Sequence, residues 1–307
     1  GFRFVFLEDA MKQKRWKIVK ILSIAGLSFS LVSTVIAIGL YQSWVIAEPG
    51  EHLSEEAIIS SMDRESPVFY RDGQTQMNVL FEEGHRIYIS AEELPKYWIQ
   101  AITGAEDQRF YSHFGLDPRG IARAIVQNIR AGRIVSGAST LTQQTAKNLF
   151  NRPDRSLRSK LEEALNAFRL EAHYSKEKIL EFYANQFHVT GTGRGIGIAA
   201  RYFFDKEISE LDLLECAFIA GMVKGPALYD PFYSSNPERR AKNLERAEAR
   251  VDYVLQKMYE QGHISASLKQ RLQEEDIPFK RGTFRYGKSS SVDEVAKRLE
   301  YSPFPDI

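Results

Sequence analysis

The spacing of apolar residues along the chain predicts a mainly helical protein. From Leu94 onward, apolar residues recur every three or four positions, which is the period of a helix with one face in a core. Before Leu94 an Asp72-Gly73 turn separates two apolar runs, Val68 to Tyr70 and Met77 to Phe81, and this pattern predicts a short β-hairpin. We therefore expect a mainly α fold with one small hairpin.

The N-terminal region carries the longest apolar run. Ile21 to Ala47 contains no charged residue, and as a helix it would be about 40 Å long, enough to cross a hydrocarbon core of about 30 Å. Basic residues precede the run and acidic residues follow it, which by the positive-inside bias places the N-terminal tail in the cytoplasm. The alternative is a cleaved signal peptide, but the run exceeds the usual apolar length of about 7–15 residues and has no clear Ala-x-Ala site. We expect a single-pass anchor.

These patterns divide the chain into five parts. They are a basic cytoplasmic tail (1–17), a transmembrane anchor (18–47), a linker with the hairpin (48–92), a helical domain (93–280) and a C-terminal tail or start of a further segment (281–307). Cys216 is the only cysteine, so the sequence contains no intrachain disulfide and no cysteine metal cluster. Its apolar neighbours predict that it is buried.

Two adjacent carboxylates, Glu106 and Asp107, follow an apolar run that includes Trp98 and Ile102. On a helix that ends there, at least one of them lies at the edge of the core. Partial loss of water raises the pKa of a carboxyl group toward the range useful for a general base. The alternative is an ordinary helix end with two solvated acids.

A small, hydroxyl-rich loop leads into the next helical pattern. Its Ser and Thr residues are good helix N-caps, and a helix start with free N–H groups suits an anion. Gln143, Gln144 and Lys147 add neutral donors and a cation on one side. The alternative is a capped helix whose polar residues face water.

The surrounding segment is strongly basic, although the whole chain has a net charge of +1. A single acid, Asp154, lies among the basic residues Arg119, Arg123, Arg130, Arg133, Lys147, Arg152, Arg155, Arg158 and Lys160. Such a concentration of cations suits a phosphorylated ligand or anionic headgroups. The alternative is that the first arginines form the solvated stripe of a helix whose core face is Ile121, Ile125 and Ile129.

A further helix is expected from Leu157 to about Tyr174, with apolar residues on two opposite faces. One stripe is Leu157, Leu161, Ala164, Leu165, Phe168 and Ala172, and the other is Ala167, Leu170 and Tyr174. A helix that is apolar on two faces is packed between layers. Glu163 falls on the second stripe and is a candidate cleft carboxylate, whereas Glu162 lies on a charged edge. The alternative for Glu163 is a structural ion pair with Lys160 or an arginine.

Together these segments resemble the family 51 glycosyltransferases, the peptidoglycan glycosyltransferase domain of class A penicillin-binding proteins and their monofunctional relatives. The resemblance covers roughly residues 64–280. It rests on Glu106 to Asp117 (EDQRFYSHFGLD), Gly137 to Gln144 (GASTLTQQ), Tyr174 to Asn185 (YSKEKILEFYAN), Gly195 to Phe203 and Glu215 to Pro231. The family's usual Arg-Lys pair ahead of its second glutamate is Ser159-Lys160 here.

The resemblance implies a lysozyme-like domain that polymerises lipid II into β-1,4-linked peptidoglycan strands and releases undecaprenyl pyrophosphate with inversion. It implies that Glu106 is the general base, that Asp107 supports it electrostatically and that Glu163 acts on the pyrophosphate. The implied substrate-binding residues are Phe110, His113, Ser139, Thr140, Gln143, Gln144, Lys147, Asn148, Arg155, Arg158 and Lys160. His113 is expected to orient its loop.

A divalent cation, Mg²⁺ or Mn²⁺, is expected between Glu163 and the pyrophosphate, because a lone carboxylate repels phosphate oxygens. No organic cofactor and no nucleic-acid partner are expected. The expected partners are lipid II, the growing glycan chain, the membrane, and transpeptidases or other cell-wall synthesis proteins. The location implied is the bacterial plasma membrane, with the catalytic domain outside the cytoplasm.

Two rival functions remain open. A glycan-cleaving enzyme also places two carboxylates across a cleft, but the basic segment and the anchor favour the polymerase. A non-catalytic membrane scaffold is the other rival, and the presence of Glu106 and Glu163 disfavours it. Ser175-x-x-Lys178 imitates a penicillin-binding motif, but no Lys-Thr-Gly follows and we take it as a chance match.

Overall fold

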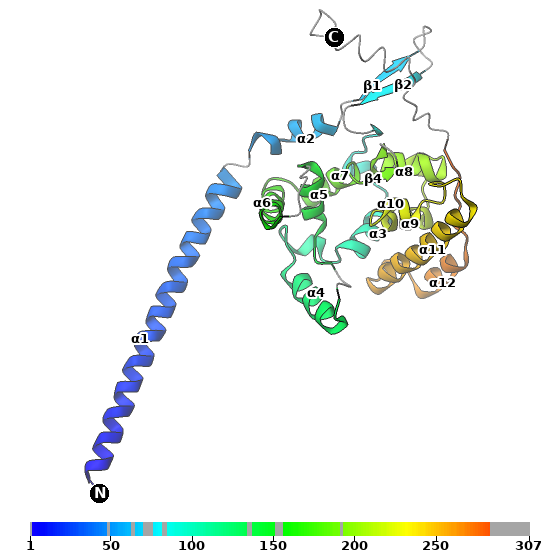
Figure 1. The fold of residues 1–307 in the computed structure, drawn as a ribbon. Coiled ribbons are helices and arrows are strands. Elements are labelled where there is room, and N and C mark those ends of the chain that lie inside the picture. The colour runs from blue at the N-terminus through cyan, green and yellow to red at the C-terminus, as the bar shows by residue number, and fades with distance from the viewer. Residues whose placement is uncertain are drawn as a thin grey trace, which may run out of the picture. The chain divides into compact units, whose positions relative to one another are not determined.

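The computed structural model describes residues 2–47, 50–62, 65–69, 76–81, 85–133, 137–150, 156–190 and 193–282. Within these residues helices dominate, which confirms the mainly α prediction (Figure 1). The chain separates into two compact units, residues 1–50 and residues 51–307.

The first unit consists of α1 (Phe2–Tyr41), followed by the π-helical segment Gln42–Ala47. Over Lys20–Ala47, 28 residues, the helix is long and apolar enough to cross a membrane. Apart from the buried Val45, its large apolar side chains are exposed, for example Phe29 at 77%. The prediction of one N-terminal apolar helix is confirmed among the described residues.

The strands within the described residues are few and short. The predicted hairpin is confirmed, because β1 (Glu65–Phe69) pairs antiparallel with β2 (Gln76–Phe81), although its Asp72-Gly73 turn lies outside the described residues. A second small sheet has the order β3 (His85–Arg86), β5 (Gly193–Arg194) and β4 (His188–Thr190). In it β3 is parallel to β5, and β4 is antiparallel to β5.

The other regular elements described in the second unit are helices. They are α2 (Glu55–Met62), α3 (Lys96–Glu106), α4 (Pro118–Ala131), α5 (Leu141–Leu149), α6 (Leu157–His173), α7 (Lys176–Ala184), α8 (Gly195–Phe204), α9 (Leu213–Met222), α10 (Pro226–Tyr229), α11 (Pro237–Glu260) and α12 (Ala266–Glu274). Short 3-10 turns occur at Glu51–Leu53, Ala91–Glu93, Phe110–Ser112 and Ile208–Glu210. The α3, α9 and α11 helices pack on one another, while α5 packs on α6 and α7.

The centre of the core is α9. All of its residues are buried, as expected for a helix that is apolar on every side. Asp212 caps its start, and the one acid within it, Glu215, is paired with Lys206 at 2.8 and 3.0 Å. Cys216 is fully buried as predicted, and burial raises the pKa of its thiol to about 12.

One alternative and one expectation about buried helix faces are wrong. In α4 only Ala124 is buried, and Ile125 and Ile129 are 53% and 74% exposed, so the proposed isoleucine core face is not a core face. In α6 the stripe with Ala167 and Leu170 is buried, but Leu157 and Leu161 are 87% and 73% exposed. Periodicity identifies an apolar face, but it does not supply a neighbouring element to cover that face.

Candidate functional site

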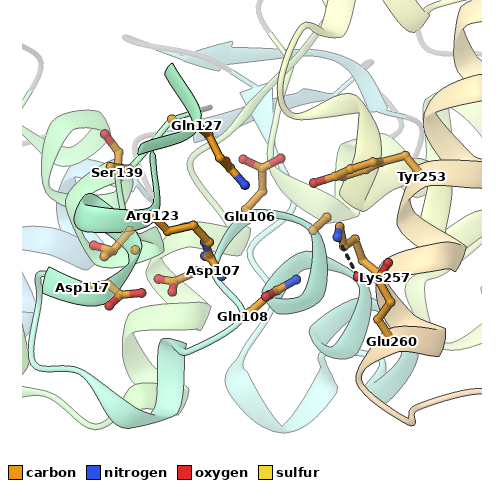
Figure 2. A pocket seen from close by; sticks show the side chains of 15 residues that line it. Glu106, Asp107, Gln108, Asp117, Arg123, Gln127, Ser139, Tyr253, Lys257 and Glu260 are labelled. Atoms are coloured by element: carbon orange, nitrogen blue, oxygen red, sulfur yellow. Dashed lines mark hydrogen bonds and ion pairs between the residues drawn. The ribbon is translucent and has the colours of Figure 1, made fainter. Parts of the chain in front are cut away.

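Two pockets adjoin each other, and Glu106 and Ser139 line both. The first pocket, of about 400 Å³, is lined by α3, α4, α11 and the loop before α5. The second, of about 630 Å³, is lined by α5, α6 and the end of α9. Figure 2 shows Glu106 in the first pocket between Gln127, from α4, and Tyr253, from α11.

Glu106 is the last residue of α3, and its side chain is 15% exposed. Its Oε1 atom accepts a hydrogen bond of 2.6 Å from Nη2 of Arg250, whose side chain is 11% exposed. The predicted core-edge position is therefore observed. The ion pair with Arg250 is an additional interaction that the sequence reasoning did not include.

Asp107 lies one residue further on but is held quite differently. It is buried, and its Oδ2 lies 2.9 Å from Nε2 of His113 and accepts a 2.9 Å hydrogen bond from the backbone N–H of Leu141. Leu141 begins α5, where a carboxylate also meets the positive end of the helix. Asp107 therefore ties the end of α3 to the start of α5.

Thr140 and Gln143 form a capping box at the start of α5. The Thr140 hydroxyl accepts from the N–H of Gln143 at 3.1 Å, and the Gln143 side chain accepts from the N–H of Thr140 at 3.1 Å. The same hydroxyl donates to the carbonyl of Gly115 at 2.6 Å. Thr140 lines the first pocket, whereas Gln143 is buried and lines neither.

His113 and Phe110 are also inside the fold and line neither pocket. Lys176 donates to the His113 carbonyl at 2.7 Å, and its ammonium group lies 4.5 Å from the centre of the Phe110 ring. These contacts hold the loop in place, and the orienting role of the His113 side chain stays a prediction.

The loop itself approaches α6 closely. Gly115 has φ of 104°, and a Cβ atom there would lie 3.1 Å from the carbonyl of Ala167 in α6. Its conformation and its closeness to α6 both favour glycine at this position.

The second pocket combines one acid from α6 with several cations. Glu163, 13% exposed, accepts a hydrogen bond from Lys160, which also donates to the Ser139 hydroxyl at 3.2 Å. Gln144 lines the same pocket, together with the exposed residues Lys147 and Lys224. The structure thus contains the ion pair of the alternative hypothesis, and it also brings Glu163 and Glu106 to one pocket.

The neighbour of Glu163 has a different environment. Glu162 is 28% exposed and pairs with Arg158 at 3.1 Å, one turn earlier on the same helix. Neither residue lines a pocket. The helical phase predicted from the sequence is therefore observed.

Two other predicted binding residues are not brought to the pockets. Arg158 is 85% exposed, and Asn148 is half-buried and lines neither pocket. Arg155 lies outside the described residues.

The sequence reasoning missed the contribution of α11. Tyr253, Lys257 and Glu260 line the first pocket, and Lys257 pairs with Glu260 at 2.7 Å (Figure 2). The sequence pattern of α11 could have indicated that Arg250 points into the core. Arg250 is three residues after Ala247 and four before Val254, both fully buried, so the helical period predicts a cation on the core face.

The side of the first pocket that α4 forms depends on an ion pair at the start of that helix. Nε of Arg109 donates to Oδ2 of Asp117 at 3.1 Å. This hydrogen bond holds the pKa of Asp117 below its ordinary value, and the backbone N–H of Gly120 adds to the effect. Asp117 is the residue before Pro118, so the pair fixes the first turn of α4.

The described residues contain no group of three or more His, Cys, Asp or Glu side chains that could hold a metal ion. Glu163 is the one carboxylate of the second pocket besides Glu106, and both are already paired with cations. This donor set does not fit a resident divalent ion.

Comparisons with known proteins bear on the same region. A family model described as Transglycosylase matches residues 72–259. Penicillin-binding protein 1A of Aquifex aeolicus (strain VF5) is 43% identical over 180 residues, which are 59% of this chain and 24% of that protein. Penicillin-binding protein 1A of Escherichia coli (strain K12) is 33% identical over 249 residues, 81% of this chain and 28% of that protein.

The relative from Neisseria flavescens, also a penicillin-binding protein 1A, is 37% identical over 214 residues, 70% of this chain and 25% of that protein. The chain thus spans about a quarter of the length of these relatives. Among solved structures, the 2.6 Å crystal structure of penicillin-binding protein 1A from Haemophilus influenzae matches with a TM-score of 0.43 and 19% identity. That match covers 78% of this chain and 24% of the other.

Proposed function

The chain belongs to the transglycosylase family, family 51 of the glycosyltransferases, and from this premise we propose that it polymerises lipid II into β-1,4-linked peptidoglycan strands. The observation that carries the proposal is the joint lining of one pocket by Glu106, Glu163 and three lysines. A base, an acid paired with a cation, and further cations are the groups that glycosyl transfer from a pyrophosphate needs.

In the proposed reaction Glu106 takes the proton from the 4-hydroxyl of the acceptor sugar. The hydroxyl oxygen bonds to the anomeric carbon of the donor while the bond from that carbon to the pyrophosphate oxygen breaks. The configuration inverts and undecaprenyl pyrophosphate leaves. Lys147, Lys160 and Lys224 line the pocket with Glu106, so their charges favour the negative charge that develops on the leaving group.

Asp107 is proposed to support Glu106 by holding the backbone in place, and not by a direct electrostatic effect. Its carboxylate is engaged by His113 and Leu141. It therefore acts by fixing the loop next to Glu106. Of the predicted binding residues, Ser139, Gln144, Lys147 and Lys160 remain candidates for contact with substrate, because they line the second pocket.

The divalent cation is a separate part of the proposal. Because the residues that the structure describes offer no set of ligands for a resident ion, a cation would have to enter bound to the pyrophosphate. Magnesium titration with and without EDTA tests this point. A rate that does not depend on the divalent ion would remove the cation from the proposal and leave the lysines as the countercharge.

Membrane location is proposed from two features. The apolar segment Lys20–Ala47 is long enough to act as the anchor, and the basic tail before it favours a cytoplasmic N-terminus. Exposed Ile125 and Ile129 lie on the face of α4 away from the pocket-lining Arg123 and Gln127, and they supply an apolar surface that suits contact with lipid. Transpeptidases and other cell-wall synthesis proteins are proposed as partners through the family alone.

The proposal is tested with purified chain and lipid II in detergent. We expect release of undecaprenyl pyrophosphate together with glycan chains that lengthen. Glu106→Gln should slow this by about 10²-fold or more, because it removes the general base but keeps the side-chain shape. The control is Glu245→Gln, an exposed acid on α11.

Other outcomes would select a rival function. Shortening of preformed glycan without release of the pyrophosphate would establish the glycan-cleaving enzyme. Binding of lipid II with no reaction of either kind would favour the scaffold. A folded Glu106→Gln protein with normal polymerisation would disprove the role of the base.

A further inference from the structure

Arg250 is anchored at three points, each on a different helix. Its Nη2 donates to Glu106 at the end of α3, and its Nε donates to the carbonyl of Gly221 in α9 at 3.0 Å. Its guanidinium carbon lies 4.7 Å from the centre of the Tyr253 ring, one turn along α11. A planar, always charged group held in this way has little freedom to move.

The packing around Gly221 supports the same conclusion. A Cβ atom at this position would lie 3.0 Å from Cγ of Arg250 and 3.3 Å from Cγ2 of Val254. The aliphatic part of Arg250 therefore lies directly against the backbone of α9. Its place is set by the core and not by solvent.

The location of Glu106 gives this arrangement a chemical purpose. Glu106 is the last residue of α3, where the unsatisfied carbonyl groups of a helix give partial negative charge. A carboxylate is unfavourable there unless a cation compensates for it. Arg250 provides that cation at 2.6 Å and binds only one of the two oxygens, Oε1.

The second oxygen has a different environment. Among the described residues we find no hydrogen bond to Oε2 of Glu106, while the residue as a whole lines both pockets. A base works best when its position is fixed and one lone pair remains free for the incoming proton. Binding of Oε1 alone meets both conditions.

We infer that Arg250 is a positioning residue for Glu106, an inference that rests on the proposed function of Glu106 as the base. Arg250 holds Oε1 so that Oε2 faces the acceptor hydroxyl, and its positive charge compensates for the unfavourable helix end. Arg250 does not contact the substrate. Its effect on the reaction passes through Glu106.

A double-mutant cycle tests whether Arg250 acts through Glu106. Arg250→Met removes the guanidinium but keeps most of the volume, and we expect kcat to fall about 10- to 100-fold with KM nearly unchanged, because a misplaced reacting group can cost that much. Arg250→Lys should recover part of the rate. Arg246→Met, one turn earlier on α11 and outside both pockets, is the control.

The decisive comparison uses the Glu106→Gln background. If Arg250 acts through Glu106, Arg250→Met should cause no further loss there, because residues that act as a unit are not additive. Losses that multiply, or a normal rate in Arg250→Met alone, would overturn the inference. Thermal unfolding of each variant separates lost activity from lost stability.

A second measurement does not depend on turnover. In a crystal structure of the Arg250→Met protein, the Glu106 carboxylate should leave its present position. An unmoved carboxylate would overturn the inference whatever the activity. Failure of the wild-type chain to polymerise lipid II would instead count against the proposed function, so the two failures are distinguishable.

Discussion

The two sides of the cleft around Glu106 are built in opposite ways. On one side α3, α9 and α11 pack together, and every residue of α9 is buried. On the other side α4 buries only Ala124, and the first turns of α6 leave Leu157 and Leu161 exposed.

The contrast shows how the protein divides its tasks. The packed side holds Glu106 through Arg250 and so fixes the proposed base. The open side carries apolar residues for which the described part of the chain provides no cover, and these remain available to a lipid-linked substrate or to the membrane. Apolar residues therefore contribute stability on the packed side, and in the proposed function they contribute contact with lipid on the open side.

The sharpest test of this contrast compares one apolar residue from each side. Phe218 in α9 is 1% exposed, and its ring centre lies 4.8 Å from those of Phe203 and Phe279. Phe218→Ala should lower the free energy of unfolding by about 3–5 kcal/mol, because it leaves a cavity. Ile129→Ala should change it by no more than about 0.5 kcal/mol. Denaturant unfolding followed by circular dichroism measures both, and equal losses would disprove the contrast.

A second test compares neighbouring acids on α6. Glu163→Gln should reduce turnover of lipid II by about 10²-fold, the usual cost of one charged group that acts on the transition state. Glu162→Gln should leave turnover almost intact, since that side chain faces Arg158 outside both pockets. Initial rates at saturating substrate decide the ranking. The reverse ranking would move the second functional acid to Glu162.

A third test concerns the open side alone. Replacing Ile125 and Ile129 together by Ser should lower turnover on lipid vesicles by about threefold or more, since each isoleucine that enters lipid contributes at most about 1.5–3 kcal/mol. Turnover in detergent micelles and the thermal midpoint should hardly change, because both side chains are already exposed. If vesicle and micelle rates fell equally, these residues would not act through the membrane.

The smallest expected effect is a dependence on pH. The Arg109 ion pair lowers the folded-state pKa of Asp117 below the ordinary value of 3.8, so its stabilising contribution is present above that pH. The contribution is lost as the pH falls through the lowered folded-state pKa. Asp117→Asn should lower the urea midpoint modestly at pH 7, and the difference from wild type should close in acid.

The control for this measurement is Asp276→Asn, an exposed acid after α12. Its difference in urea midpoint from wild type should not change as the pH falls. A difference that stays constant with pH would mean that packing, and not charge, anchors the first turn of α4.

Much of the fold follows from local pattern. The bounds of α6 and the presence of the hairpin and of an apolar N-terminal helix were predictable, because helical period, turn residues and charge-free length are properties of contiguous sequence. The placement of Glu163 and Glu162 on different faces of α6 was predictable in the same way, because successive residues of a helix are about 100° apart.

The rest depends on contacts between distant parts of the chain. Arg250 lies 144 residues from Glu106 in the sequence, and no local sequence pattern predicts which acid pairs with a buried cation. The burial of Asp107 similarly depends on the start of α5. The exposure of Ile125 and Ile129 was missed because periodicity describes one helix at a time, while burial needs a second surface.

The close approach of Gly115 to α6 also links the two proposed functional acids. The loop that contains Gly115 continues from Glu106, and the helix that it touches at Ala167 carries Glu163 one turn earlier. The spacing of the two carboxylates thus depends on a contact between two stretches of backbone. A single added methyl group at position 115 would push these stretches apart and widen the gap between the acids while leaving both side chains chemically intact.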